Sequence, residues 1–426
     1  MTLTIHNFAK IETADVVLDG ITLISGANDS GKSTCGKVLC TLLTAINQIE
    51  KSSWEIRRNK IKEVLRSFTQ RHDNGIFHFL FLDDEEVDKY LRGGISVEKF
   101  AQGQINSIYG SSKRHKGMDI GTLIRQLEEV RLLSEKEVRC TGLQKSFATV
   151  FHSQYMPLYK NNADNQKSGP TTVTLKHCSS ELSIELTKNS SIYNESSGCK
   201  YKAWYLNDPS IVDRIGVSFG EYGNDWFSHT ILKALSQQLM NQTINPVEEA
   251  FDDTLLKGKL SLIDSQFKRM NDDELGFSKS RGLLIKRKGF REGLLLSNAS
   301  MGIKSLSLIR LLIKNRVISQ GDILVLDEPE IHLHPEWQMI YAELLVLIWK
   351  ELGIYVLLTT HSPDFTQAVR LYAKKHGVLS NVTAYLSVGT STVRFEQLKN
   401  KDWDKLFDRF LPTVKMLENL AEEVDH

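Results

Sequence analysis

Cysteine and net charge are both scarce in this sequence. Five cysteines occur in 426 residues, an odd number, and none forms a C-x-x-C pair. A disulfide framework is therefore not expected, and free thiols in a reducing cytoplasm are the simplest interpretation. Lysine and arginine (53) nearly balance aspartate and glutamate (52), so the whole chain has no field that attracts nucleic acid or a membrane.

Long apolar runs are missing as well. The most apolar window, residues 340–358, contains Glu343, Lys350 and Glu351, so no segment is expected to cross a bilayer unaided. The first ten residues, MTLTIHNFAK, have no basic region followed by an apolar stretch, which argues against a signal peptide. We therefore expect a cytoplasmic protein without a membrane partner.

The apolar pattern predicts an α/β fold whose mainly parallel central sheet is built from both chain ends. Residues 3–26 alternate like two or three short strands, and a helix follows them. The C-terminal part predicts, in order, a hairpin (282–296), a helix (302–315), a buried strand (323–327), a helix (336–351) and a buried strand (354–360). Strands separated by helices in this way favour one parallel sheet.

The middle of the chain has a different pattern. Residues 47–155 are mostly helical and charged, and within 120–151 a helix of ~30 residues would reach ~45 Å. The predicted organisation is an N-terminal head part (1–46), a helical insertion (47–160), an antiparallel β-rich segment (161–225), a helical segment (226–280), a C-terminal head part (281–395) and a helical tail (396–426).

A phosphate-binding loop follows the strand ITLIS. The segment GANDSGKS matches G-x-x-x-x-G-K-[ST] and opens a helix, which is the structural context that this motif requires. Backbone N–H groups of the loop converge on phosphate oxygens, Lys32 neutralises the β- and γ-phosphates, and Ser33 coordinates Mg²⁺. The predicted nucleotide-binding residues are Gly26, Ala27, Asn28, Asp29, Ser30, Gly31, Lys32, Ser33 and Thr34.

Two further buried strands end in residues suited to hydrolysis. ILVLDEPE (323–330) places Asp327 at a strand end, where it would reach the Mg²⁺ shell beside Ser33. Glu328 follows as the natural general base for the attacking water. LLTTHSPD (357–364) ends in His361, whose neutral imidazole could bridge the γ-phosphate and that water. We predict Glu328 and His361 as the catalytic residues.

A second anion site is predicted at SNASMGIK (297–304), which we call the signature segment. Small residues precede an apolar helix, so Ser300, Gly302 and the backbone N–H groups beside them form another helix N-terminus suited to phosphate. One chain has no evident need for two cradles in the same site. The economical interpretation is that this one caps the γ-phosphate held by a second copy, in a head-to-tail pair around two ATP molecules.

The ordered set GANDSGKST, SNASMGIK, ILVLDEPE and TTHS resembles the ABC-type ATPase superfamily. The opening strand LTIHNF and the segment EIHLHPEWQ (330–338) are more narrowly similar to RecF/SMC-like and overcoming-lysogenisation-defect-like ATPases. The resemblance implies ATP and Mg²⁺ as cofactors, and ATP-driven engagement of two heads. It matches Ser300 and Gly302 to the signature's serine and last glycine, whereas Met301 replaces its first glycine.

Such heads also use a glutamine that senses Mg²⁺ and the attacking water. Gln154, in FHSQYMP, is one candidate, and the loop within YLNDPSIVD (205–213) is a rival position for it. His332 and His334 alternate in the sequence, but no third ligand is spaced with them, so a structural loop role is favoured over a metal site.

The function predicted from the sequence is ATP hydrolysis that regulates a separate effector. After His361 only about 65 residues remain, without paired metal-binding carboxylates, so the chain is not expected to be a nuclease itself. Its size resembles the ATPase components of two-gene anti-phage systems such as Septu, PARIS and some retrons, which implies a homodimer or an assembly of dimers with a nuclease partner.

Two other classes stay open. A DNA-repair ATPase of RecF type would clamp duplex DNA, and a transporter ATP-binding subunit would pair with a membrane protein, which the EIHLHPEWQ segment and the long insertion argue against. Basic clusters occur around Arg57–Arg71, at Lys113–Lys116 and at Lys286–Lys288. A solvated helix face is favoured for each cluster over a nucleic-acid contact, and nucleic acid remains an open partner.

Overall fold

The computed structural model describes residues 1–72, 84–109, 119–150, 170–178, 180–186, 191–195, 201–215, 226–240, 258–259, 261–270, 273–278, 282–286, 289, 293–399, 402–408 and 416. The chain divides into two compact units. The first comprises Met1–Leu43, Ala148–Ser190 and Glu195–His426, and the second comprises Thr44–Phe147 and Ser191–Asn194. The candidate Gln154 lies outside the described residues, as does the basic cluster at 113–116.

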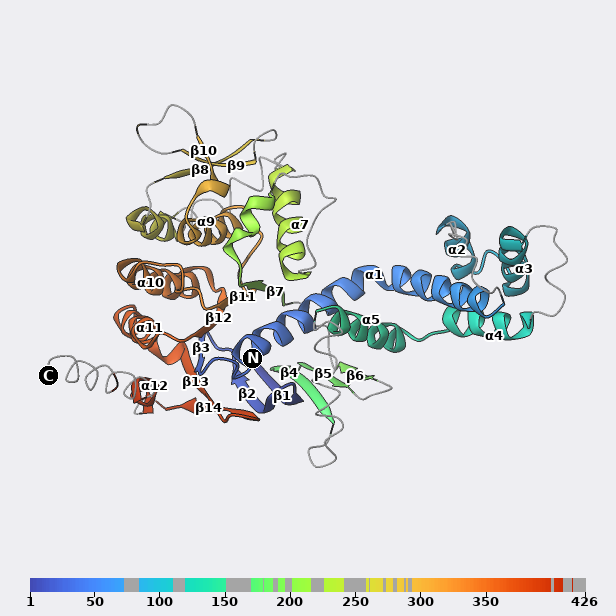
Figure 1. The fold of residues 1–426 in the computed structure, drawn as a ribbon, viewed down its shortest axis with the longest axis horizontal. Helices are drawn as coiled ribbons and strands as arrows, with labels where there is room; N and C mark the ends of the chain where they lie inside the picture. Colours follow the sequence, from blue (N-terminus) through green and yellow to red (C-terminus); the bar gives the residue numbers. More distant parts are fainter. Residues whose placement is uncertain are drawn as a thin grey trace. The chain divides into compact units, whose positions relative to one another are not determined.

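The first unit is built on one large mixed sheet (Figure 1). Its strands are β1 (Thr2–Phe8), β2 (Ile11–Val17), β3 (Ile21–Gly26), β4 (Thr171–His177), β5 (Ser180–Leu186), β7 (Ala203–Leu206), β11 (Ile323–Asp327), β12 (Tyr355–Thr360), β13 (Val382–Val388) and β14 (Val393–Leu398). They follow the order β5-β4-β1-β2-β14-β13-β3-β12-β11-β7. The predicted α/β class, with a sheet assembled from both chain ends, is confirmed.

The centre of this sheet is parallel and its flank is antiparallel. β13, β3, β12, β11 and β7 pair in parallel, as β14 does with β2. β1 pairs antiparallel with β2 and β4, and β4 with β5. Strands of the segment 161–225 therefore lie at both sides of the sheet, with β4 and β5 beyond β1 and β7 beside β11.

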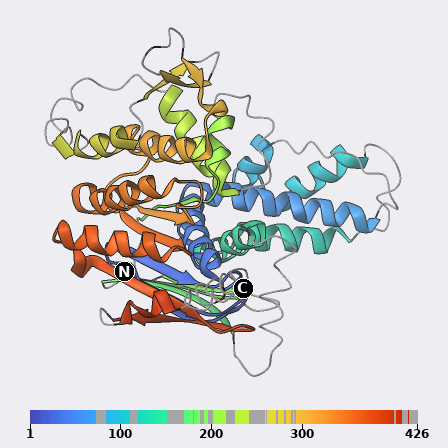
Figure 2. The same ribbon diagram turned by 60° about the vertical axis from the view of Figure 1, so that its left-hand side comes forward.

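Helices cover the parallel centre on both faces. The helical elements of the first unit are α7 (Trp226–Met240), α9 (Met301–Lys314), α10 (Pro335–Leu352), α11 (Pro363–Lys375), α12 (Lys405–Asp408), η2 (Pro209–Arg214), η3 (Leu296–Asn298), η4 (Leu379–Asn381) and the start of α1 (Lys32–His72). α10 and α11 lie on one face and the first turns of α1 on the other (Figure 2).

Strand alternation explains these two layers. Leu324 and Leu326 of β11 belong to the core cluster that also contains side chains of α9, α10 and α11. Val325 points to the opposite face, where a Cβ added to Gly36 of α1 would lie 2.7 Å from its Cγ1 atom. α10 has clear local end signals, because His334 caps its first turn, Pro335 is its first residue and Gly353 ends it at φ 64°.

A small antiparallel sheet also belongs to the first unit. It contains β8 (Glu274–Ser278), β9 (Gly282–Lys286) and β10 (Leu294–Leu295) in the order β10-β9-β8. β9 and β10 pair antiparallel, which confirms the hairpin predicted for residues 282–296.

The second unit is mainly helical. It contains the continuation of α1 with α2 (Asp84–Leu91), α3 (Val97–Tyr109), α4 (Ile120–Arg131) and α5 (Glu135–Val150) as far as Phe147, together with most of β6 (Ser191–Glu195). Its core joins apolar side chains of α1 to those of α2, α3 and α4, with Tyr90 and Phe100 stacked at a centroid distance of 4.5 Å.

The prediction of a single helix of ~30 residues within 120–151 is wrong, because the chain turns between α4 and α5. Ser134 begins the new helix with a reciprocal capping pair to Glu137. The Glu137 amide donates to Ser134 Oγ at 3.2 Å, and the Ser134 amide donates to Glu137 Oε2 at 2.7 Å. This exchange satisfies helix-end amides locally, so a break costs little there.

The first basic cluster is largely engaged within the second unit. Arg58 binds Asp88 with two hydrogen bonds of 2.9 and 2.7 Å, and Lys62 lies 2.5 Å from Asp84. Arg57 donates to the Leu133 carbonyl at 2.8 Å. These cations position α2 and the α4–α5 turn. Separately, no helix in the described parts of the chain is long and apolar enough to span a membrane.

A buried carboxylate connects three helical segments of the first unit. Glu343 of α10 is 3% exposed and contacts Arg269, Lys375 and His376 at 3.1, 2.9 and 2.9 Å. Burial alone would raise the pKa of Glu343, but hydrogen bonds from Lys375 and His376 and the charge on Lys375 lower it below its ordinary value. Glu343 therefore stabilises the fold in its charged form.

We predict that Glu343→Gln lowers the free energy of unfolding by about 2 kcal/mol at pH 7, because charge-assisted hydrogen bonds are lost. Since the folded-state pKa is lowered, the stabilisation exists above the ordinary value of 4.5 and disappears as the pH falls through the folded-state value. Urea denaturation of both proteins between pH 3 and pH 7 tests this. A difference that persists unchanged at the acid end would contradict it.

Candidate functional site

The carboxyl ends of four parallel strands meet at one edge of the sheet. The register pairs Asp327 of β11 with Thr359 of β12, and Thr360 of β12 with Ser25 of β3. Leu326 pairs with Leu206 of β7, so Asn207 follows beside Asp327. Ligands of open parallel sheets bind at this edge, and the predicted site residues of β3, β11 and β12 all arrive there.

The phosphate loop connects β3 to α1 in a tight turn. Gly31 adopts φ +77°, and a Cβ at this position would lie 2.9 Å from Ile11 Cγ1, so only glycine fits. Ala27, Asn28 and Asp29 form an exposed tip, where Asp29 is paired with Lys10. Ser30 behind them is buried, and its carbonyl accepts from Ser387 Oγ at 2.7 Å.

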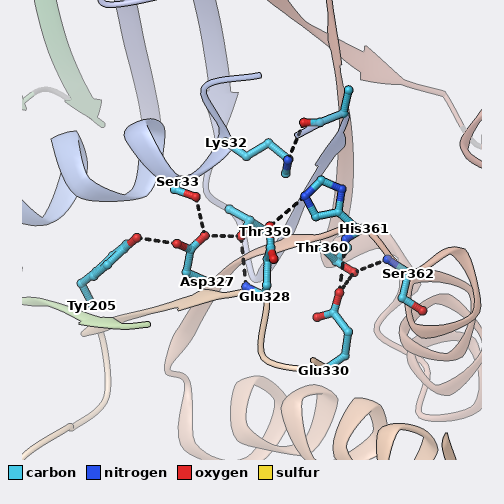
Figure 3. A network of polar contacts seen from close by, with 11 residues as sticks. Lys32, Ser33, Tyr205, Asp327, Glu328, Glu330, Thr359, Thr360, His361 and Ser362 are labelled. Carbon is cyan, nitrogen blue, oxygen red and sulfur yellow. Dashed lines mark hydrogen bonds and ion pairs between the residues drawn. The ribbon is translucent and has the colours of Figure 1, made fainter. Parts of the chain in front are cut away.

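Lys32 is folded back onto its own loop. The side chain is 3% exposed, and Nζ donates to the Ala27 carbonyl at 2.8 Å (Figure 3). A buried ammonium needs anionic or carbonyl partners. The contact keeps the cation directly beneath the backbone groups that the sequence predicts to surround phosphate.

Asp327 accepts hydrogen bonds from three hydroxyl groups that come from different elements (Figure 3). Ser33 Oγ of α1 and Thr359 Oγ1 of β12 donate to Oδ1 at 2.8 and 2.5 Å, and the Tyr205 hydroxyl of β7 donates to Oδ2 at 2.7 Å. The Ser33–Asp327 contact brings together the two residues predicted to bind Mg²⁺. Their hydroxyl and carboxylate oxygens are the ligands that this ion prefers.

Glu328 lies next to Asp327 in a strained backbone conformation. Its φ of 50° is in the left-handed region, which costs roughly 1–3 kcal/mol for a residue other than glycine. Its amide donates to the carbonyl and the hydroxyl of Thr359 at 3.1 and 3.2 Å, which stabilises this conformation. The geometry turns the Glu328 side chain to His361, whose Nε2 atom lies 2.7 Å from Oε1 (Figure 3).

A cavity of about 340 Å³ opens beside these residues. It is lined by Ser33, Leu206, Asn207, Asp208, Pro209, Ser305, Leu308, Leu326, Asp327, Glu328, Pro329, Ile331 and His332. The loop within residues 205–213, which is the alternative to Gln154, follows β7 and therefore reaches the site through Asn207 and Asp208. Asn207 is exposed, whereas the Asp208 side chain caps η2 by accepting from the Ser210 amide at 2.8 Å.

The signature segment has a different position. Ser300 is exposed and is the N-cap residue of α9, but its side chain makes no capping hydrogen bond to that helix. Gly302 is buried, and a Cβ there would lie 2.7 Å from the His332 carbonyl oxygen. Neither of the two is among the described residues that line the cavity, whereas Ser305, one turn further along α9, is.

Several residues of the site were missed from the sequence. Tyr205 and Thr359 are hydrogen-bonded to Asp327, and Thr360 is hydrogen-bonded to Glu330 at 2.5 Å. The two threonines directly precede His361 at the end of a predicted buried strand, so strand register alone could have identified them. His334 takes the structural role that was favoured for it, since its side chain accepts from the Glu336 amide at 3.4 Å.

The fold and the loop geometry define a nucleotide-binding protein of the phosphate-loop class. The AAA ATPase domain family matches residues 1–366, and the chain belongs to this family. It is therefore an ATPase that binds nucleotide. A search of curated proteins finds no match.

Solved structures with a similar chain are heads of SMC proteins. One, an SMC head bound to the C-winged helix domain of ScpA, is 12% identical, with 95% of this chain and 98% of that chain covered and a TM-score of 0.46. An SMC head domain from Thermotoga maritima is 14% identical, with 93% and 98% covered and a TM-score of 0.39. An Smc head with an extended coiled coil, bound to the C-terminal domain of ScpA from Pyrococcus furiosus, is 11% identical, with 99% and 98% covered and a TM-score of 0.39.

We predict that Tyr205→Phe raises the Mg²⁺ concentration needed for half-maximal ATPase activity by about tenfold. The substitution removes one donor to Asp327 and leaves the ring beside Phe227, so the carboxylate is less well oriented. Magnesium titration of the steady-state rate measures this effect, with Tyr372→Phe on α11 as the control. An unchanged requirement would show that the Tyr205 hydroxyl does not orient Asp327.

Proposed function

We propose that this chain is an ABC-type ATPase head that closes head-to-tail on a second copy around two ATP molecules, and that its nucleotide state regulates a separate effector, a nuclease, in anti-phage defence. The observation that carries the hydrolytic part is the contact of Glu328 with His361 at 2.7 Å, beside the Ser33–Asp327 hydrogen bond at 2.8 Å. Base, histidine and ion-binding oxygens converge on one edge of the sheet.

Each side chain of the site has a separate role in hydrolysis. Lys32 leaves the Ala27 carbonyl for the β- and γ-phosphates, and the loop amides bind their oxygens. Ser33 and Asp327 would hold Mg²⁺, which when bound neutralises phosphate charge. Glu328 accepts the proton of the attacking water. An ionised carboxylate only accepts hydrogen bonds, so His361 donates from Nε2 and fixes the Glu328 carboxylate in the free protein.

We assign the role of sensing the ion and the attacking water to Asn207, in the loop that follows β7. β7 is the parallel neighbour of β11, and Asn207 lines the cavity together with Ser33 and Asp327. Its exposed side-chain amide offers both a donor and an acceptor at that position. We therefore prefer Asn207 to Gln154 for this role.

The exposed Ser300 supports the paired arrangement. Its hydroxyl is not used to cap α9, and the first turn of α9 carries partial positive charge from its N–H groups. We infer that a second copy supplies the phosphate that this segment caps, because the chain already has a phosphate loop of its own. Two identical composite sites result from such a two-fold arrangement.

The effector is assigned by resemblance to anti-phage ATPases that work with a nuclease. A DNA-clamping role has less support, because Arg57, Arg58 and Lys62 contact groups of the second unit. Purification from the native host with ATP present, followed by mass spectrometry, decides between the two. A retained nuclease supports the defence role, and retained DNA with salt-sensitive stimulation of hydrolysis supports the clamp.

We predict that Glu328→Gln binds ATP normally but hydrolyses it about 10²- to 10⁴-fold more slowly, since the proton acceptor is lost. The variant should accumulate as a dimer with ATP, which size-exclusion chromatography with light scattering detects. Lys32→Ala is the control that binds no ATP and stays unpaired. Wild-type turnover in Glu328→Gln would refute the base assignment.

We also predict that Ser300→Arg abolishes turnover and leaves ATP binding to the single chain intact, while Ser380→Arg, at an exposed serine of η4, has no effect. Mixing Ser300→Arg with Lys32→Ala should restore measurable hydrolysis, because a mixed dimer joins the intact phosphate loop of the first variant to the intact signature segment of the second and so holds one complete site. A mixture as inactive as its parts, or an active Ser300→Arg protein, would contradict the composite site.

A further inference from the structure

One buried acid of the site has no part in the chemistry described so far. Glu330 lies on the turn between β11 and α10 and is 4% exposed. Burial raises the pKa of its carboxyl group. A carboxyl group this deeply buried costs free energy unless its hydrogen bonds compensate, so the partners of Glu330 show what the acid is for.

Two hydrogen bonds connect the Glu330 carboxyl group to the turn that carries His361. Glu330 Oε1 accepts from Thr360 Oγ1 at 2.5 Å and from the His361 backbone amide at 3.2 Å (Figure 3). Its second oxygen, Oε2, is buried without a partner among the described residues. Glu330 thus accepts hydrogen bonds from the backbone of His361 and from the side chain of Thr360.

The same turn is fixed on its other side. Thr360 Oγ1 also accepts from the Ser362 amide at 3.0 Å, and Ser362 Oγ accepts from the Phe365 amide at 3.1 Å, capping α11. His361 is therefore held between the end of β12 and the start of α11. Glu330 connects this turn to the segment after β11, which also carries Glu328.

The sequences DEPE and TTH consequently pair side chain by side chain across two strands. Asp327 accepts from Thr359, Glu328 contacts His361, and Glu330 accepts from Thr360. The first pair positions the carboxylate proposed to bind the ion, and the second joins the base to the histidine. The third pair makes no described hydrogen bond to the phosphate loop, and Glu330 also accepts from the backbone amide of His361.

We propose that Glu330 is a positioning residue, which holds the His361 backbone so that Nε2 reaches the Glu328 carboxylate in the geometry that hydrolysis requires. This inference rests on the proposed roles of Glu328 and His361. A displacement of about 1 Å in a reacting group can cost about 100-fold in rate. Loss of the Glu330 acceptor should therefore act on turnover and spare nucleotide binding.

The matched control is Glu343, the other buried carboxylate described above. It is 3% exposed, compared with 4% for Glu330, and it also accepts hydrogen bonds from a neighbouring turn, here through Lys375 and His376. Its partners are Arg269 and, at the C-terminal end of α11, Lys375 and His376, and none of them contacts Glu328 through a described hydrogen bond. Loss of stability alone would therefore affect both variants alike, whereas loss of positioning affects only Glu330.

The activity test compares Glu330→Leu, Glu330→Gln and Glu343→Gln. We expect kcat to fall about 100-fold in Glu330→Leu, with KM and the nucleotide Kd within about threefold of wild type. Glu330→Gln retains one acceptor oxygen and should recover to within about tenfold of wild type. Glu343→Gln should keep the wild-type kcat. Equal losses in Glu330→Leu and Glu343→Gln, in step with their stability, would overturn the proposal.

Thr360→Val keeps the test decisive if Glu330→Leu does not fold. This variant removes the hydroxyl group that donates to Glu330 and that also accepts from the Ser362 amide. We expect about a tenfold lower kcat, with Thr360→Ser restoring the rate. A wild-type kcat in Thr360→Val would count against the proposal. Non-additive effects of Thr360→Val and Glu330→Gln would show that the two side chains act together.

An NMR measurement on the protein without nucleotide tests the positioning role of Glu330 separately from the proposed ATP hydrolysis. In the free protein labelled with ¹⁵N-histidine, the His361 side-chain signals can be assigned by their loss in His361→Ala. Glu330→Gln and Thr360→Val should shift these signals, whereas Glu343→Gln should shift those of His376. Unchanged His361 signals overturn the positioning role. An inactive wild-type protein with shifted signals refutes the hydrolytic assignment alone.

Discussion

The register between β11 and β12 is the constraint on which the site depends. Parallel pairing sets Asp327 beside Thr359. Glu328 and Glu330, which follow β11, then lie against His361 and Thr360 at the end of β12. Because side chains alternate along a strand, a slip of one residue would send Asp327 and the apolar residues before it to the wrong faces. The buried leucines of β11 and β12 thus fix the position of the polar groups at their ends.

This edge of the sheet combines backbone strain with a buried acid. Glu328 is held at a positive φ by bonds from its amide to Thr359, while Glu330 is buried against the next turn. Both features cost stability and are offset by the large apolar cluster below them. Asp327, Glu328 and Glu330 are therefore each held by contacts to the end of β12 or to His361, which suits the role of base that we propose for Glu328.

The sequence allowed the fold class, the order of the central strands and helices, and the meeting of Ser33 with Asp327 to be predicted, because these depend on local periodicity and on motifs at strand ends. The break between α4 and α5 was missed, although Ser134 and Glu137 carry the capping pattern, since apolar spacing continues across it. Tyr205 could not be assigned, because its contact with Asp327 requires β7 to add to the sheet beside β11, more than 100 residues away in the chain.

The left-handed backbone of Glu328 has a consequence for the evolution of this protein. A glycine or asparagine at position 328 would relieve the torsional strain, so selection for thermal stability alone would replace the acid there. With Glu328 as the proposed base, selection for stability and selection for turnover favour different residues at this position. Lineages that no longer hydrolyse nucleotide would be expected to drift toward the relaxed residue first, and would become more heat-resistant as they did so.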